Sequence, residues 1–220
     1  GKSYVIGNLV EQGPLTGNST ILAYLEEGTN PSNPINELYV VNNSFQNDRT
    51  SGGTFLSIGS GATAIVIKNN IFSGPGTLTN ASGATLANNF VGNPQFVDPT
   101  NYDYHLTSGS PAVDAGADPG TGDGNSLLPT FQYVHPACAE GRNAVGVIDI
   151  GAYELGGGTG VPPAMAPARC TSGSGPAPAV SLAPATLTFS SQLVGTPSAA
   201  QGVTLTNSGN AALSITLISA

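Results

Sequence analysis

The sequence predicts an all-β protein: a parallel β-helix, a linker rich in glycine and proline, and the first strands of a second β-module. Three observations lead to this fold class. A short apolar segment ending in paired asparagines recurs along the N-terminal part of the chain. No segment shows the 3.6-residue apolar period of an amphipathic helix. An alternating apolar pattern begins again near residue 180, after a stretch of glycine, proline and serine.

The repeated segment is a strand followed by a turn. Its clearest copy is IVIKNNIF at residues 65–72, and related copies are LYVVNNSF at 38–45, TLANNF at 85–90 and YVIGNLV at 4–10. One such unit cannot bury its apolar residues alone, whereas stacked units bury a continuous column. The copies recur at irregular intervals, which is typical of a coil with fixed strands and variable loops. Ordinary antiparallel strands joined by asparagine turns remain the alternative.

The asparagine pair suits the sharp turn that must follow each strand. Asparagine tolerates the left-handed backbone that a sharp turn requires. Amides stacked from one turn of the coil to the next can also bond each other in a ladder. We therefore assign a structural turn and ladder role to Asn43, Asn70 and Asn89.

Further strands are expected between the repeats. TILAYL at residues 20–25 belongs to an irregular first turn over 1–27, and TFLSI at 54–58 fills another side of the coil over 37–97. The chain begins abruptly beside a strand, so we expect it to continue a longer coil, with any export signal upstream.

Two later motifs carry a family resemblance. SGSPAVDAG at residues 108–116 and DIGAYE at 149–154 occur in the order in which they close the coil of bacterial right-handed parallel β-helix surface proteins of the pectate-lyase-like superfamily. The chain resembles that family over residues 1–155, which implies a right-handed coil and a structural role for Asp114 and Asp149. The insert at 117–147 stands where many members of that family have a short acidic link.

The rest of the chain has two parts. Residues 156–179 read as a linker, flexible through glycine and serine and extended through proline. Residues 180–220 resemble the start of an ASH-type immunoglobulin-like module, in LAPATLTF at 182–189 and VTLTNSGNAAL at 203–213. A complete sandwich needs roughly 100 residues, so we expect the module to be incomplete.

The composition of the chain argues against several classes of binding partner. Charged residues make up only 8% of the chain, and the net charge is −8, which argues against nucleic acid and anionic membrane surfaces as partners. No segment is apolar and long enough to insert in a membrane. A polar, weakly charged surface is typical of exported β-proteins, so we expect an extracellular or cell-surface location, a glycan partner and a monomer.

Three residues are candidates for contact with a sugar. Tyr102, Tyr104 and His105 form an aromatic cluster in sequence, and strand alternation would put the two tyrosines on one face. The alternative is that the tyrosines pack in the core or cap of the coil.

A calcium loop is a second candidate site. Asp118, Asp123 and Asn125 supply oxygen atoms between glycines, as a Ca²⁺ loop would. Their spacing matches no established loop, so a turn-rich insert without any cofactor is the favoured interpretation.

Cys138 and Cys170 are the two cysteines, and in an exported chain they are expected to form one disulfide. We assign no catalytic residue. Lys68 is the nearest candidate for a lyase base, but a solvated residue at a strand edge explains it better.

These observations favour an exported bacterial surface or secreted protein that faces carbohydrate or acts as an adhesin, without catalysis in this stretch. One alternative is the C-terminal part of a polysaccharide lyase or glycoside hydrolase with its active coil turns upstream, so whether the parent is an enzyme stays open. Another is a passive structural spacer.

Overall fold

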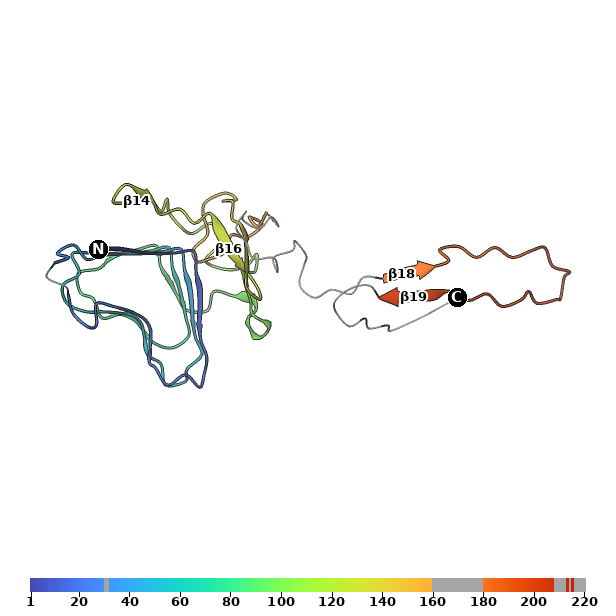
Figure 1. Cartoon of the computed structure of the whole chain (residues 1–220), viewed down its shortest axis with the longest axis horizontal. Coiled ribbons are helices and arrows are strands. Elements are labelled where there is room, and N and C mark those ends of the chain that lie inside the picture. Colours follow the sequence, from blue (N-terminus) through green and yellow to red (C-terminus); the bar gives the residue numbers. More distant parts are fainter. Residues whose placement is uncertain (30–31, 160–179, 208–212, 214, 216–220) are drawn as a thin grey trace. The chain divides into compact units, whose positions relative to one another are not determined.

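The computed structural model describes residues 1–29, 32–159, 180–207, 213 and 215. The chain divides into two compact units, Gly1–Ser172 and Gly173–Ala220, and the boundary between them falls in the sequence of the predicted linker. Nearly all regular structure is β-strand, and one 3₁₀ turn, Pro99–Asn101, interrupts it. The predicted all-β class is confirmed (Figure 1).

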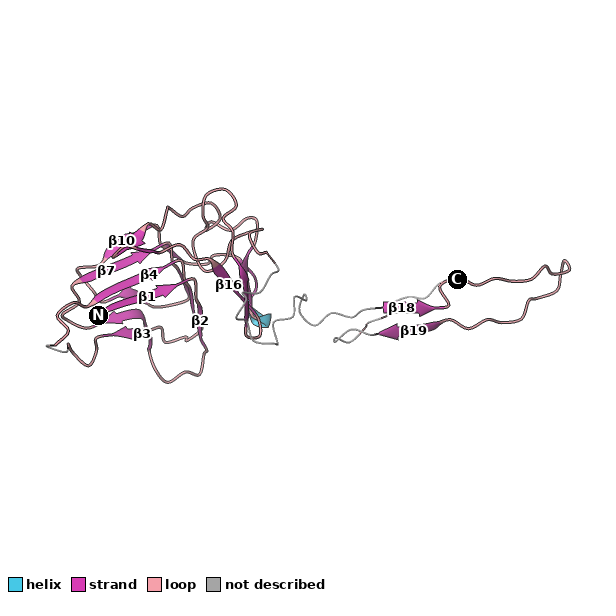
Figure 2. Cartoon of the chain, turned by 45° about the horizontal axis from the view of Figure 1, so that its top comes forward, coloured by secondary structure: helices cyan, strands magenta, loops and turns pink. Residues whose placement is uncertain are grey.

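Three parallel sheets build the first unit. The first sheet has the order β1 (Lys2–Ile6), β4 (Glu37–Val41), β7 (Ala64–Lys68) and β10 (Thr85–Ala87). The second has β2 (Leu9–Gln12), β5 (Ser44–Asn47), β8 (Ile71–Ser73) and β11 (Phe90–Val91). The third has β3 (Thr20–Tyr24), β6 (Thr54–Ile58) and β9 (Thr77–Thr79). The chain visits the three sheets in turn, so each complete repeat adds one strand to each sheet (Figure 2).

Equivalent positions of the repeats lie above one another. Val5 pairs with Val40, Val40 with Ile67, and Ile67 with Leu86, all in parallel register. Phe45 and Phe72 also pair, and their rings stack at a centroid distance of 5.3 Å. Stacking like on like buries one apolar core between the three sheets, which a single repeat could not do.

The asparagine pairs form the turns that connect strands of the first sheet to strands of the second sheet. The first residue of each pair is left-handed, with φ of 52° at Asn42, 55° at Asn69 and 49° at Asn88, and Gly7 takes the same place at φ 69°. The second residue of each pair contributes its side-chain amide to a ladder that runs from one repeat to the next. Asparagine and glycine are the residues that adopt this backbone at least cost, which explains their recurrence.

The later part of the first unit folds into three antiparallel hairpins. They are β12 (Phe96–Asp98) with β13 (Asp103–Leu106), β14 (Thr121–Gly122) with β15 (Asn125–Ser126), and β16 (Phe131–Val134) with β17 (Cys138–Gly141). Phe96, Leu106, Ala112 and Ile150 pack with Ile71 of the second sheet. The β12–β13 hairpin and the segments around Ala112 and Ile150 therefore cover the outer face of that sheet.

The described part of the second unit contains one antiparallel pair, β18 (Val180–Ala183) with β19 (Thr204–Asn207). Its strand residues are exposed, Leu182 by 54% and Leu205 by 39%. Residues 160–179, most of the predicted linker, lie outside the described residues.

Candidate functional site

The asparagine ladder fixes the turns against which the closing segments pack. We call these segments, residues 108–116 and 142–155, the cap. Asn8, Asn43 and Asn70 each donate a backbone N–H and a side-chain amide N–H to Oδ1 of the next asparagine, at 2.9–3.0 Å. Asn43 and Asn70 are fully buried, and each side-chain amide also donates to strand carbonyls. Because the buried amides of Asn43 and Asn70 both donate and accept, the ladder satisfies polar groups that would otherwise be costly to bury.

The first asparagines bind the closing segment instead. Asn42 Nδ2 donates to the carbonyl of Asp149 at 2.9 Å, and the N–H of Gly151 donates to the carbonyl of Asn69 at 2.8 Å. Gly151 has φ 101°, and a Cβ there would lie 2.5 Å from Cδ1 of Ile71. Only glycine lets this segment approach the sheet so closely.

Asp114 and Asp149 connect the segment at 108–116 with the segment at 149–154. Asp149 Oδ1 accepts the N–H of Asp114 at 2.7 Å, and its Oδ2 accepts the N–H of Leu155 at 2.7 Å. Asp114 Oδ1 accepts the N–H of Val147 at 3.0 Å. Burial raises the pKa of the Asp149 carboxyl, although the two N–H donors oppose that rise. Both carboxylates thus bond backbone of the cap.

A buried ion pair completes the cap. Arg142 Nη2 lies 3.0 Å from Glu154 Oε2, and both side chains are at most 1% exposed. Arg142 also donates to the carbonyls of Gly151 and Asp149, while Glu154 accepts the N–H groups of Val145 and Asp149. Burial lowers the pKa of the arginine, and the Glu154 carboxylate counteracts this. No local pattern predicts this pair, because Arg142 lies in the insert at 117–147.

The three predicted sugar-contact residues have different environments. Tyr104 is 2% exposed and packs edge-on against Phe96, and burial raises the pKa of its hydroxyl. Tyr102 is 51% exposed, because it ends the 3₁₀ turn in a left-handed conformation and so precedes the strand that starts at Asp103. The expected strand alternation therefore does not extend to Tyr102.

Tyr102 and His105 belong to one surface cluster with residues from other segments. The rings of Tyr102 and His135 stack at 5.0 Å with an interplanar angle of 8°. The Tyr133 hydroxyl lies 3.3 Å from His135 Nδ1, and Tyr133 packs against the buried cluster that contains Tyr153. Tyr153 in turn lies 4.4 Å from the His105 ring. Both histidines of the chain therefore lie in this aromatic cluster, which we define as Tyr102, His105, Tyr133, His135 and Tyr153.

The cluster also has polar edges. Asp103 Oδ1 accepts the backbone N–H of His105 at 3.1 Å and lies 2.6 Å from its Nδ1. Burial raises the pKa of the Tyr133 hydroxyl. The His105 and Asp103 side chains are 44% and 42% exposed, so their free edges can bond a ligand hydroxyl.

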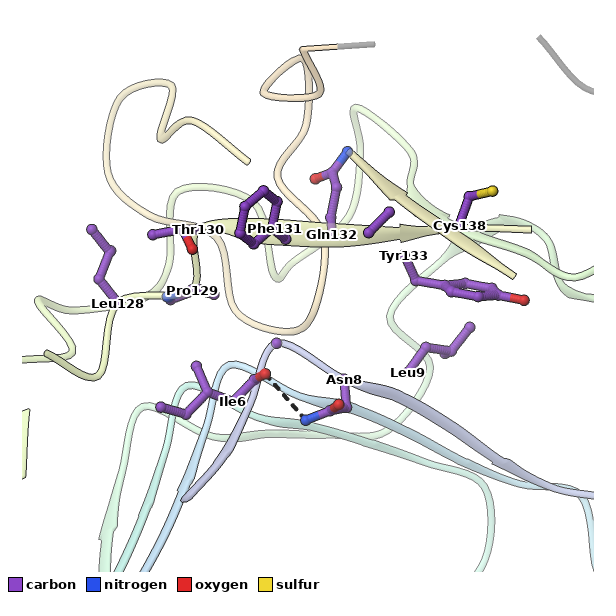
Figure 3. Close-up of a pocket in the computed structure, with 12 residues that line it drawn as sticks. Ile6, Asn8, Leu9, Leu128, Pro129, Thr130, Phe131, Gln132, Tyr133 and Cys138 are labelled. Atoms are coloured by element: carbon purple, nitrogen blue, oxygen red, sulfur yellow. Dashed lines mark hydrogen bonds between the residues drawn. The ribbon is translucent and has the colours of Figure 1, made fainter. Parts of the chain in front are cut away.

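A groove of about 490 Å³ adjoins the cluster at Tyr133 (Figure 3). It runs between the turn from β1 to β2 and the β16–β17 hairpin. Its lining carries no charged side chain and consists of Ile6, Gly7, Asn8, Leu9, Leu128, Pro129, Thr130, Phe131, Gln132, Tyr133, Cys138 and Ala139. Figure 3 shows Asn8 and Ile6 on one wall, opposite Pro129 and Thr130.

The three calcium candidates have partners within the chain. Asp118 Oδ1 accepts the N–H of Gly120 at 2.9 Å, Asp123 forms an ion pair with Lys2, and Asn125 Nδ2 donates to the Tyr4 hydroxyl at 3.1 Å. Among the described residues, no three His, Cys, Asp or Glu side chains gather in a metal-binding arrangement. Calcium binding by this segment stays a prediction.

The remaining predicted residues are also placed. The Lys68 ammonium donates to the carbonyl of Asp118. Cys138 begins β17, but Cys170 lies outside the described residues, so the disulfide stays a prediction. In the part of the chain that the structure describes, no helix has the length and apolar character to cross a membrane.

Comparison with known proteins adds no relative. No family model matches this chain, and no curated protein or solved structure shows significant similarity to it.

Proposed function

We propose that this chain is part of an exported bacterial surface or secreted protein that contacts carbohydrate through the aromatic cluster. In this proposal the stacked parallel sheets are the end of a right-handed parallel β-helix of the pectate-lyase-like superfamily. Residues 180–220 begin an ASH-type immunoglobulin-like module. The two closing motifs and the parallel register of the repeats support this assignment.

The observation that carries the proposed function is the stacked pair Tyr102 and His135. Half of the Tyr102 surface is exposed although the residue sits in an ordered turn. A flat aromatic surface binds the apolar face of a sugar ring, and adjacent polar groups fix its hydroxyls. Asp103 and His105 supply such groups beside the cluster.

The support beneath the cluster is rigid. Tyr153 is 3% exposed and belongs to the segment held by Asn42 and by the Arg142–Glu154 pair. Holding aromatic side chains in place lowers the entropy cost of binding. The arrangement therefore suits a binding surface on a stalk, without chemistry of its own.

A polysaccharide panel tests the proposal. The 220-residue chain is incubated with insoluble neutral and uronic-acid polymers, and the bound fraction is measured by sedimentation. We expect at least one polymer to retain the chain. If no polymer retains it, the carbohydrate-binding function is wrong and the passive spacer becomes the better interpretation. Absorbance of unsaturated products, with and without Ca²⁺, is followed in parallel, and a rise would replace the binding function with a lyase.

A further inference from the structure

A second groove, of about 580 Å³, lies on the outer face of the second sheet. Phe45 and Phe72 face the core in β5 and β8. The residues that follow them, Gln46 and Ser73, pair with each other and face outward by strand alternation. No residue of the aromatic cluster lines this groove, and its lining carries no charged side chain. The lining includes Gln46, Ser73, Asn93, Gln95, Phe96 and Pro99.

Ser73 is a buried polar residue whose hydroxyl lacks a partner. The residue is only 7% exposed, yet its hydroxyl forms no hydrogen bond within the part of the chain that the structure describes. The small part of Ser73 that solvent reaches includes this oxygen, at the wall of the groove. Buried hydroxyls are normally hydrogen-bonded, because leaving one unpaired costs free energy. A ligand that bonds this hydroxyl would recover that cost.

Three side-chain amides share the lining with Ser73. Gln46 Nε2 donates to Asp48 Oδ1 at 2.6 Å, which leaves Gln46 Oε1 without a donor among the described residues. Asn93 Oδ1 accepts the backbone N–H of Gln95 at 2.9 Å, and Asn93 Nδ2 has no acceptor in the same part of the chain. The side-chain amide of Gln95 likewise has no partner there. The groove therefore offers both donors and acceptors to the hydroxyl groups of a ligand.

Gln95 occupies a backbone position that favours glycine. Its φ is 58°, in the left-handed region. Its N–H donates to Asn93 Oδ1, and its carbonyl accepts the N–H of Thr107 at 3.1 Å, so both bonds hold this conformation. A glycine would adopt the same backbone at less cost. The turn alone therefore does not account for an amide side chain at this position, and strained residues are typical of binding sites.

The chemistry of the groove favours an uncharged sugar residue. Phe96 and Pro99 supply apolar surface for the C–H face of a sugar ring, and the amides and the serine hydroxyl suit its hydroxyl groups. Asp48 bonds Gln46, and Asp98 directly precedes Pro99, so two carboxylates flank the lining. A sugar that carries a carboxylate would be repelled by these charges.

The groove adjoins the aromatic cluster. The N–H of Tyr102 donates to the carbonyl of Pro99 at 3.0 Å across the 3₁₀ turn. Phe96 packs edge-on against Tyr104, which directly precedes His105, with ring centroids 5.2 Å apart. A 3₁₀ turn rises about 2 Å per residue, so Pro99 and Tyr102 lie roughly 6 Å apart. The two sites are therefore within reach of one glycan chain.

We propose that the second groove is a binding subsite for an uncharged sugar residue of the glycan that the aromatic cluster contacts. Ser73 and Gln95 bond the hydroxyl groups of this residue, and Phe96 packs against its ring. The inference rests on the proposed function in one respect, because it takes carbohydrate as the ligand.

NMR titration of the isotope-labelled 220-residue chain tests the subsite. The probes are the neutral disaccharides cellobiose, maltose and lactose, and digalacturonate is the charged comparison. The side-chain amide signals of Gln46, Asn93 and Gln95 report on the groove, and the signals of Tyr102 and His135 report on the aromatic cluster. We expect at least one neutral disaccharide to shift the three amide signals, and digalacturonate to shift them less.

The two sets of signals separate this inference from the proposed function. Shifts at the groove without shifts at the cluster would contradict only the proposed function. Absence of shifts at the groove, with or without shifts at the cluster, would overturn the subsite. Equal shifts by digalacturonate and the neutral disaccharides would overturn the preference for an uncharged sugar.

Ser73→Ala and Gln95→Gly separate binding from folding. Each removes a side-chain group that has no partner among the described residues, and glycine suits the backbone at position 95, so both variants should keep the wild-type circular dichroism spectrum. Each should bind the responding disaccharide about threefold to tenfold more weakly, as expected for one lost hydrogen bond. Ser60→Ala, at an exposed serine between β6 and β7, is the matched control and should leave the affinity unchanged. Wild-type affinity in the folded variants would overturn the proposal, and if one variant does not fold, the other decides.

Discussion

The side-chain amide of Asn43 donates to Oδ1 of Asn70 at 2.9 Å, and both residues are fully buried. This bond links two turns of the chain that lie 27 residues apart in sequence. The same contact recurs between Asn70 and Asn89, so each turn positions the next. The cap, with its aromatic cluster, rests on these turns through Asn42 and Asn69.

Asn70→Ala should destabilise the first unit strongly. The change removes the acceptor of two N–H groups of Asn43 and the donors to Asn89 and to the carbonyl of Val40. Each buried group left unpaired costs about 1–3 kcal/mol, so we expect a total loss on the order of 3 kcal/mol or more. Urea unfolding measures this loss. Asn8→Ala, at the exposed end of the ladder, should cost clearly less, and equal losses would contradict a cooperative ladder.

Glu154→Gln should also be costly, because it leaves the charge of Arg142 buried without a counter-charge. Removing one partner of a buried ion pair costs about 3–5 kcal/mol. The control is Lys2→Met, which breaks the solvent-exposed pair with Asp123 and should cost much less stability than Glu154→Gln. Thermal unfolding measures the stability lost in each variant. If Glu154→Gln lost no more stability than Lys2→Met, the buried pair would contribute little to the folded state.

The raised pKa of Tyr39 should make the stability of the protein fall at alkaline pH. Its hydroxyl donates to Glu37 Oε2 at 2.8 Å, and this bond, with burial, raises the pKa of Tyr39 to about 12 from 10.0. The folded protein therefore keeps a proton that the unfolded chain loses. The stabilisation is fully present below pH 10 and is lost as the pH rises through about 12.

Denaturant titrations between these pH values measure the effect. Tyr104, Tyr133 and Tyr153 also have raised pKa values, so the informative quantity is the difference between wild type and Tyr39→Phe. The wild type should lose more stability than Tyr39→Phe over this range. Parallel curves for the two proteins would mean that the Tyr39 pKa is not raised by folding.

The repeats could be predicted from sequence because strand, turn and ladder are local and periodic. The copies at 38–45, 65–72 and 85–90 each contain a strand, a left-handed asparagine and a ladder asparagine. The register between neighbouring strands follows when equivalent positions of successive repeats are aligned. Phe90 lies above Ile71 and not above Phe72, as its earlier position in the motif indicates.

The candidate site could be predicted only in part. Tyr102 and His105 were named from their own segment, but His135 and Tyr133 come from an insert with no periodic pattern. Their approach depends on the long-range packing of the β16–β17 hairpin, which no local signal encodes. Alternation also failed at Tyr102, because a 3₁₀ turn ends there and the strand begins one residue later.

Calorimetric titration of Tyr102→Ala tests the central claim, which is that the aromatic cluster binds carbohydrate. The ligand is a soluble fragment of whichever polysaccharide retains the wild-type chain. We predict a dissociation constant at least about tenfold larger for Tyr102→Ala, the size expected when a central aromatic contact is lost. Phe189→Ala, a change at a half-exposed aromatic of the second unit, should leave it unchanged. Unaltered affinity in a folded Tyr102→Ala would contradict the account.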